Sequence, residues 1–178
     1  MMCSPHRREQ PVKTLKRKCL SYFFMVFSVW TMSCGDTPLS QYTPRSTDEK
    51  QIVSVLMQYQ DARNRFDLER LLSLLHEKGE FTFQCGMQVS KNRLKEMLPG
   101  FWEELKSGDS AVIPLVHECI NGDYYHTGRL NNPQVEIHND TALATALFTK
   151  GVCRVLLNVA LLREDGRWLI TRTEWGES

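Results

Sequence analysis

The sequence predicts one α+β domain over residues 47–178, in which three N-terminal helices pack on a curved antiparallel sheet. Two observations support this class. Apolar residues recur at helical spacing up to about residue 105, and from about residue 111 the period changes to the alternation of strands. Helices followed by a run of strands are typical of an α+β domain, with the helices gathered on one face of the sheet.

Two adjoining helices are expected first. Ser46 and Glu49 have the spacing of a capping box, and apolar side chains then recur at helical spacing, so a helix is predicted from about residue 47 to residue 65. Asp67 can cap the second helix. Its apolar face is expected to consist of Leu68, Leu71, Leu72 and Leu75.

A third helix is expected to begin at Ser90, after a short strand over residues 80–85. Pro99-Gly100 should kink or break this helix, because proline cannot donate the backbone hydrogen bond. Beyond it, Asn139-Asp140 and Asp165-Gly166 supply two hairpin turns, the second a strong type I′ signal. The strands expected in this region cover residues 112–119, 124–129, 134–138, 142–149, 152–163 and 167–175.

The first 33 residues have the organisation of a secretory signal. Basic residues up to Lys18 precede an uncharged apolar run of 15 residues that ends at Ser33. A membrane-spanning helix needs about 20 apolar residues, so cleavage before Cys34 is favoured over a retained anchor. We therefore expect a signal peptide over residues 1–33 and a flexible tether over residues 34–46, which are rich in Pro, Ser and Thr.

The cleavage site also resembles the lipobox of bacterial lipoproteins, in which the cysteine becomes the lipid-modified first residue. Cys34 carries this resemblance, although Thr31 stands where that family usually has leucine. The resemblance implies an exported lipoprotein of the cell membrane or outer membrane that faces the periplasm. Ordinary cleavage, for which Thr31 and Ser33 are suitably small, would instead leave a secreted protein.

Removal of the signal changes the charge of the chain. The first 33 residues hold six of the 22 basic residues and one of the 21 acidic residues, so 16 basic and 20 acidic residues remain, a net charge of −4. An acidic domain without a basic run lacks the electrostatic footprint of nucleic-acid binding, and we exclude that class.

No cofactor or metal is expected. Cys85, Cys119 and Cys153 have neither CxxC nor Cys/His spacing, so a zinc site is not supported. An odd trio is also not a disulfide framework. The sequence contains no glycine-rich phosphate loop, nucleophile elbow or paired-carboxylate motif.

The order of the elements resembles the NTF2-like superfamily, a cone-shaped α+β roll that includes SnoaL-like polyketide cyclases, ketosteroid isomerases and scytalone dehydratase. Residues 59–75 look like the first helix of that family turning into the second, and residues 164–175 look like its closing segment. The resemblance implies an apolar pocket between the helices and the concave face of the sheet. Both enzymes and plain binding modules use this fold.

Three positions bear on catalysis within this resemblance. Tyr59 matches the tyrosine that donates to the oxyanion in ketosteroid isomerases, and Asn158 matches the second donor, which is an acid there. Phe83 occupies the position of the carboxylate that moves the proton. An oxyanion hole without a base cannot move a proton between carbons, so isomerase activity of that type is disfavoured.

Strand alternation adds further pocket candidates. Trp168, Ile170, Arg172 and Glu174 should share one face of the last strand. Arg172 and Glu174 would then have to pair or bind something if that face is enclosed, and a salt bridge at the rim is the alternative. The expected pocket residues are Tyr59, Phe83, Trp102, Asn158, Trp168, Arg172 and Glu174.

Two functions are compatible with these residues. One is a module that binds a small apolar ligand, or a partner, at the cell envelope; the other is a SnoaL-like cyclase, isomerase or dehydratase. The enzyme would need a general base close to the ligand. The histidines that could serve are His76, His117, His126 and His138.

A homodimer is expected from the strand over residues 152–163, because it is largely apolar on both faces. A sheet that is covered by helices on one side normally presents polar residues on the other. A second apolar face indicates a partner, most simply a second copy of the chain.

Overall fold

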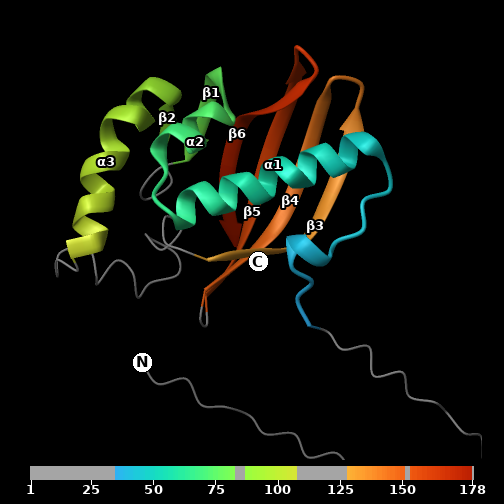
Figure 1. Ribbon diagram of the computed structural model, residues 1–178, viewed down its shortest axis with the longest axis horizontal. Coiled ribbons are helices and arrows are strands. Elements are labelled where there is room, and N and C mark those ends of the chain that lie inside the picture. The colour runs from blue at the N-terminus through green and yellow to red at the C-terminus, as the bar shows by residue number, and fades with distance from the viewer. Residues whose placement is uncertain (1–34, 83–86, 108–127, 151–152, 178) are drawn as a thin grey trace, which may run out of the picture. The chain divides into compact units, whose positions relative to one another are not determined.

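The computed structural model (Figure 1) describes residues 35–82, 87–107, 128–150 and 153–177. The helical elements are a 3-10 helix η1 (Leu39–Gln41), α1 (Thr47–Asn64), α2 (Leu68–Ser73) and α3 (Lys91–Ser107). The strands are β1 (Leu75–Thr82), β2 (Gln88–Ser90), β3 (Arg129–His138), β4 (Thr141–Lys150), β5 (Cys153–Glu164) and β6 (Arg167–Glu177).

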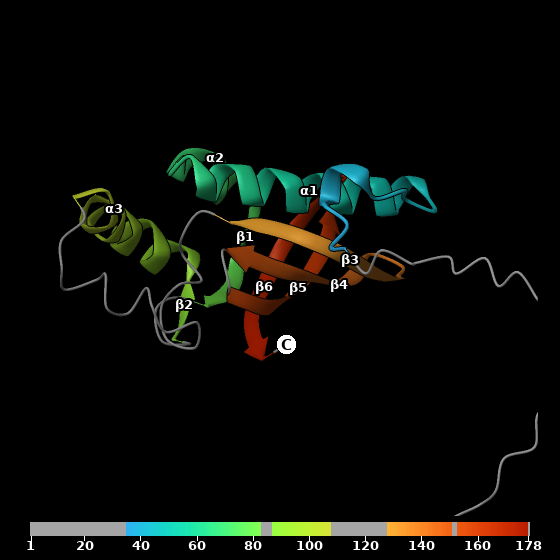
Figure 2. The same cartoon turned by 90° about the horizontal axis from the view of Figure 1, so that it is seen from below.

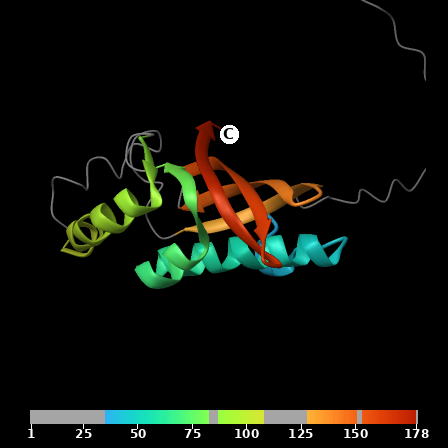
Figure 3. The same cartoon turned by 90° about the horizontal axis from the view of Figure 1, so that it is seen from above.

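The strands form one curved sheet with the order β2-β1-β6-β5-β4-β3. Figures 2 and 3 show α1 and α2 lying along one face of this sheet, with α3 next to the β1–β2 end. No described helix covers the opposite face, which we call the outer face. The predicted α+β class, with helices packed on one face of a curved sheet, is confirmed.

Helices α1 and α2 begin where the sequence predicts. The Ser46 hydroxyl accepts a hydrogen bond from the backbone N–H of Glu49 at 3.1 Å, and the Asp67 carboxylate caps α2 in the same manner. The Glu49 carboxylate, instead of completing the capping box, accepts from the Tyr42 hydroxyl at 2.6 Å and from the Arg45 guanidinium at 2.9 Å. This network joins the start of α1 to the preceding segment.

Helix α2 is shorter than expected. It ends at Ser73, and Leu75, expected on its apolar face, is the first residue of β1. Leu75 pairs with Ile170 of β6, and the Ile170 N–H donates to the Leu74 carbonyl at 2.9 Å. Sheet pairing thus prevails over helical periodicity here. The strand expected over residues 80–85 consequently begins at residue 75, and it runs parallel to β6.

Helix α3 continues through Pro99, so the break that was one expectation there does not occur. An interior proline removes one backbone hydrogen bond of the helix. Burial of the apolar face offsets this loss, since Leu94, Leu98, Phe101 and Trp102 are each at most 6% exposed.

Strands β3 to β6 form an antiparallel meander. Strands β4, β5 and β6 have nearly the expected bounds, whereas β3 begins at Arg129, five residues before the strand expected over residues 134–138. The Asp165-Gly166 turn has positive φ at both residues, 49° and 74°, as a type I′ turn requires. The expected strand over residues 112–119 and most of that over 124–129 lie outside the described residues. The core lies between α1 and the inner face, where Ile52, Leu56, Leu157 and Ile170 are fully buried.

Residues 35–46, which we call the N-terminal strap, are folded onto the domain, so the expectation of a flexible tether there is wrong. Leu39 is buried, and the Thr37 N–H donates to the Asn132 side chain at 2.7 Å. Asp36 accepts two hydrogen bonds from Arg154, both at 2.8 Å, which lower the pKa of the Asp36 carboxyl. Apolar burial and this ion pair outweigh the linker-like composition.

None of the helices in the described ranges is both long and apolar enough to cross a membrane. The apolar run over residues 19–33 lies outside those ranges.

Candidate functional site

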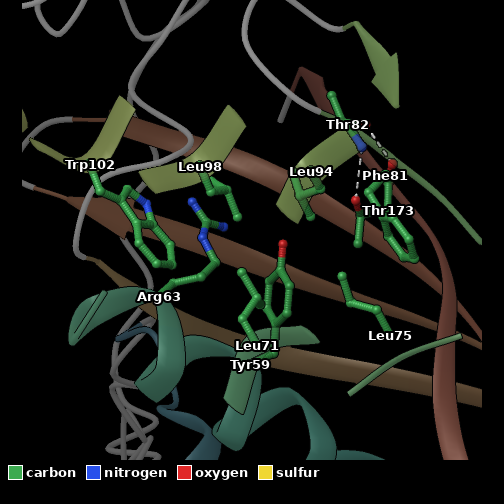
Figure 4. Close-up of a pocket in the computed structure, with 10 residues that line it drawn as sticks. All are labelled: Tyr59, Arg63, Leu71, Leu75, Phe81, Thr82, Leu94, Leu98, Trp102 and Thr173. Atoms are coloured by element: carbon green, nitrogen blue, oxygen red, sulfur yellow. Dashed lines mark hydrogen bonds between the residues drawn. The ribbon is translucent and has the colours of Figure 1, made fainter. Parts of the chain in front are cut away.

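A narrow cavity lies between the helices and the inner face of the sheet, near the β1–β2 end (Figure 4). It contains about 330 Å³ of atom-free space including its mouth, but the centre of a water molecule can move through only about 20 Å³ of it. Its described lining consists of Tyr59, Arg63, Leu71, Leu75, Phe81, Thr82, Leu94, Leu98, Trp102 and Thr173. The lining is therefore mostly apolar and comes from five elements, α1, α2, α3, β1 and β6.

Tyr59 and Arg63 place polar groups inside this cavity. They are one helical turn apart on α1 and only 7% and 6% exposed, and Figure 4 shows the hydroxyl and the guanidinium directed into the same space below Leu94 and Leu98. The Arg63 guanidinium lies 5.4 Å from the ring centroid of Tyr59 and 5.0 Å from that of Trp175. Aromatic faces attract a cation at such distances and partly compensate its burial.

Thr82 and Thr173 form the polar edge of the cavity on the sheet side. The Thr82 N–H donates to the Thr173 hydroxyl at 3.1 Å, and the Thr82 hydroxyl donates to the Thr173 carbonyl. Both side chains are buried. These hydrogen bonds join β1 to β6 and satisfy the two threonines without a ligand.

Arg172 and Glu174 point away from the cavity, contrary to the prediction that they share a face with Trp168 and Ile170. A β-bulge between β5 and β6 pairs Arg172 with Ala160 and Ile170 with Leu161, leaving one extra residue in β6. Side chains beyond a bulge exchange faces. Arg172 and Glu174 accordingly form an ion pair with each other on the outer face, which matches the salt-bridge alternative.

Asn158 and Trp168 also lie outside this cavity. Asn158 is on the outer face of β5, half-buried and opposite Glu174, because its apolar neighbours Leu157 and Val159 are buried on the inner face. Its proposed pairing with Tyr59 as a second oxyanion donor is therefore wrong. Trp168 is buried, as expected, but in the core near Val55 of α1, where it lines a separate groove.

Trp102 lines the cavity as the sequence predicts, and its ring packs edge-to-face on Phe66 with centroids 5.5 Å apart. Phe83, His117 and His126 lie outside the described residues. None of the described lining residues is a histidine, aspartate or glutamate. His76 is paired at 3.7 Å with Glu164, and His138 is exposed.

Within the described ranges, no group of three or more His, Cys, Asp or Glu side chains is placed to hold a metal ion.

Three polar residues of the described lining, Arg63, Thr82 and Thr173, were not among the predicted pocket residues. Arg63 had a visible signal, because it occupies the apolar stripe of α1 in step with Leu56 and Tyr59. A charged residue at a core position is costly and therefore informative. Thr173 had no such signal, since its inward direction depends on the bulge.

Comparison with known proteins places the architecture in one class. No protein-family model and no curated protein matches the sequence. Among solved structures, a protein of unknown function with a cystatin-like fold from Nostoc punctiforme has a TM-score of 0.54 and 13% identity, covering 76% of this chain and 96% of that one.

Two further structures are described as NTF2-like. The protein from Cytophaga hutchinsonii has a TM-score of 0.52 and 14% identity, over 75% of this chain and 100% of that one. The protein from Pseudomonas putida, of unknown function, has a TM-score of 0.51 and 15% identity, over 72% and 85%. The chain thus has an NTF2-like fold, and likenesses this remote establish nothing beyond the fold.

Proposed function

We propose that this protein is a binding module of the cell envelope that holds a small apolar or amphipathic ligand in the cavity of Figure 4. The lining of the cavity carries this proposal: apolar side chains from five elements surround one hydroxyl and one guanidinium. A mostly apolar pocket with a few directed polar groups is typical of small-molecule sites. The described lining contains no histidine, aspartate or glutamate that could act as a general base, which favours binding over a SnoaL-like reaction.

Filling the cavity should abolish binding. Leu94 is 5% exposed and lines the space beside Tyr59, so Leu94→Phe should weaken the affinity for linear alcohols from butanol to decanol by more than about tenfold, since added atoms occupy the site. Titration followed by the indole N–H signal of Trp102 in NMR spectra would measure the affinity. Native mass spectrometry of the purified protein would reveal any ligand retained from the cell.

The matched control is Leu143→Phe, the same substitution at a side chain that is 57% exposed on the outer face. It should leave the affinity unchanged. If Leu94→Phe binds the alcohols as well as the unmodified protein does, or if no alcohol perturbs Trp102, the cavity is not the binding site.

We propose that Cys34 is lipid-modified and anchors this module to a membrane. The support is the sequence alone: a basic segment, an apolar run and small residues before the cysteine. Cys34→Ser should move the protein from the membrane fraction to the soluble fraction, with the same melting temperature, because the substitution lies outside the packed domain. A mutant that stays in the membrane fraction would instead support a retained helix.

We also propose that a second copy of the chain covers the outer face. This face presents the exposed Leu143 with half-buried Leu147, Leu156, Leu162 and Leu169. Arg172 and Glu174 lie on the same face, opposite Ala160 and Asn158 of β5, so both signs of charge border one apolar area. Such a surface can pair with an identical copy about a two-fold axis. A monomeric mass at high micromolar concentration would contradict this.

A further inference from the structure

A purely apolar ligand would form neither a hydrogen bond nor an ion pair with Arg63, the charged residue of the cavity. Among the described lining residues it is the one that carries a full charge at neutral pH. Its side chain is 6% exposed, and it also lines the neighbouring cavity formed with Gln60, Asn64, Gly128, Leu130 and Phe148. A cation held in so apolar a space interacts strongly with any anion that enters, because the low local dielectric amplifies the attraction.

The surroundings of the guanidinium determine which anion fits. Tyr59 and Trp175 offer ring faces, at 5.4 Å and 5.0 Å, and a ring face attracts the cation without accepting a planar pair of hydrogen bonds. A carboxylate matches the fork of N–H donors in a guanidinium. The Tyr59 hydroxyl, directed into the same space, can donate one more hydrogen bond to such a group.

The apolar residues of the lining determine which group can be attached to the carboxylate. Leu71, Leu75, Leu94 and Leu98 line the cavity with apolar side chains, from Leu98 beside Arg63 to Leu75 on β1. The space is narrow, so a thin chain fits it better than a fused ring system.

We propose that the cavity selects carboxylates with a short apolar chain, with the carboxylate on Arg63 and Tyr59 and the chain among the leucines. This inference rests on the proposed binding function and assigns it a ligand class. The Arg63 cation within a mostly apolar lining is what favours this class over neutral amphipaths.

The test compares ligands that differ in charge and little else. Linear carboxylates from butanoate to decanoate and their primary amides are titrated into the protein at neutral pH, with the Trp102 indole signal as the readout. The unmodified protein should bind the best carboxylate at least about tenfold more tightly than its amide, as expected for a charge-assisted pair. Arg63→Gln should bring the two affinities within about twofold of each other, and Arg63→Lys should retain an intermediate preference.

Arg65→Gln is the matched control. Arg65 lies two residues along the chain, has a 71% exposed side chain and pairs with Asp61, so this change removes the same charge without altering the cavity. It should keep the full carboxylate preference. Near-ultraviolet circular dichroism of each variant would verify that the fold is retained.

The outcomes separate the two proposals. Equal affinities of carboxylate and amide for the unmodified protein, or a preference that survives Arg63→Gln, would overturn the inference while leaving a binding module. Absence of binding by carboxylates, amides and alcohols alike would overturn both. If Arg63→Gln does not fold, the Arg63→Lys variant decides, because an unchanged preference there would contradict the bidentate contact.

Discussion

Replacing Trp168 with alanine should lower the free energy of unfolding by about 3–5 kcal/mol. The Trp168 side chain is 3% exposed, and the Arg163 guanidinium lies 5.4 Å from its ring centroid. Loss of the ring removes a large apolar area from the core and leaves a cavity that the strand cannot close. Since a domain is stable by about 5–15 kcal/mol, much of the protein would unfold at moderate denaturant concentrations.

Chemical denaturation followed by circular dichroism measures this effect. Leu169→Ala is the control, because Leu169 is adjacent in β6 but half-buried on the opposite face, and its replacement should cost clearly less. Unfolding of Trp168→Ala at the same denaturant midpoint as the unmodified protein would show that β6 presents its faces the other way round.

Replacing Glu49 with glutamine should cost about 2–3 kcal/mol of unfolding free energy, since hydrogen bonds to a charged group are among the stronger ones. The Glu49 side chain is 2% exposed and accepts from Arg45 and from the Tyr42 hydroxyl. Hydrogen bonds from the Arg45 side chain are the largest cause that lowers the pKa of Glu49 from 4.5 to about 2. The carboxylate therefore fastens the N-terminal strap to α1.

This pKa predicts how stability depends on pH. Between about pH 4.5 and pH 2 the unfolded chain binds the proton of Glu49 while the folded chain does not, so the free energy of unfolding falls as the pH is lowered. Above this window the contribution is complete. Glu49→Gln should make the free energy of unfolding depend less on pH in this window, whereas Glu69→Gln, at an exposed position in α2, should not. If Glu49→Gln leaves this pH dependence unchanged, Glu49 is not its source.

The sequence predicts those parts of the fold that depend on local chemistry. Ser46 and Asp67 mark the starts of α1 and α2 because capping needs only neighbouring backbone groups, and Asp165-Gly166 marks a hairpin because its positive φ values suit those residues. The start of β1 at Leu75 was missed, since pairing with β6 is a contact between segments far apart in the chain. The packing of Leu39 was missed for the same reason.

The candidate site was predicted less well because alternation along a strand cannot reveal a bulge. Tyr59 and Trp102, two of the expected pocket residues, do line the cavity, as helical periodicity continues undisturbed through α1 and α3. Counting two residues at a time along β6 placed Arg172 and Glu174 inside, although one additional residue sends them to the outer face and brings Thr173 inward.

The position of Asp36 limits how far the domain could stand from a bilayer. Only Gly35 separates Cys34 from Asp36, which is bound to Arg154 at the start of β5 and to Asn132 of β3. Two residues of extended chain span at most about 7 Å. If Cys34 carries the proposed lipid, this end of the sheet would rest against the head groups and the body would have little freedom to swing. The distance between the cavity and the lipid surface would then be nearly constant.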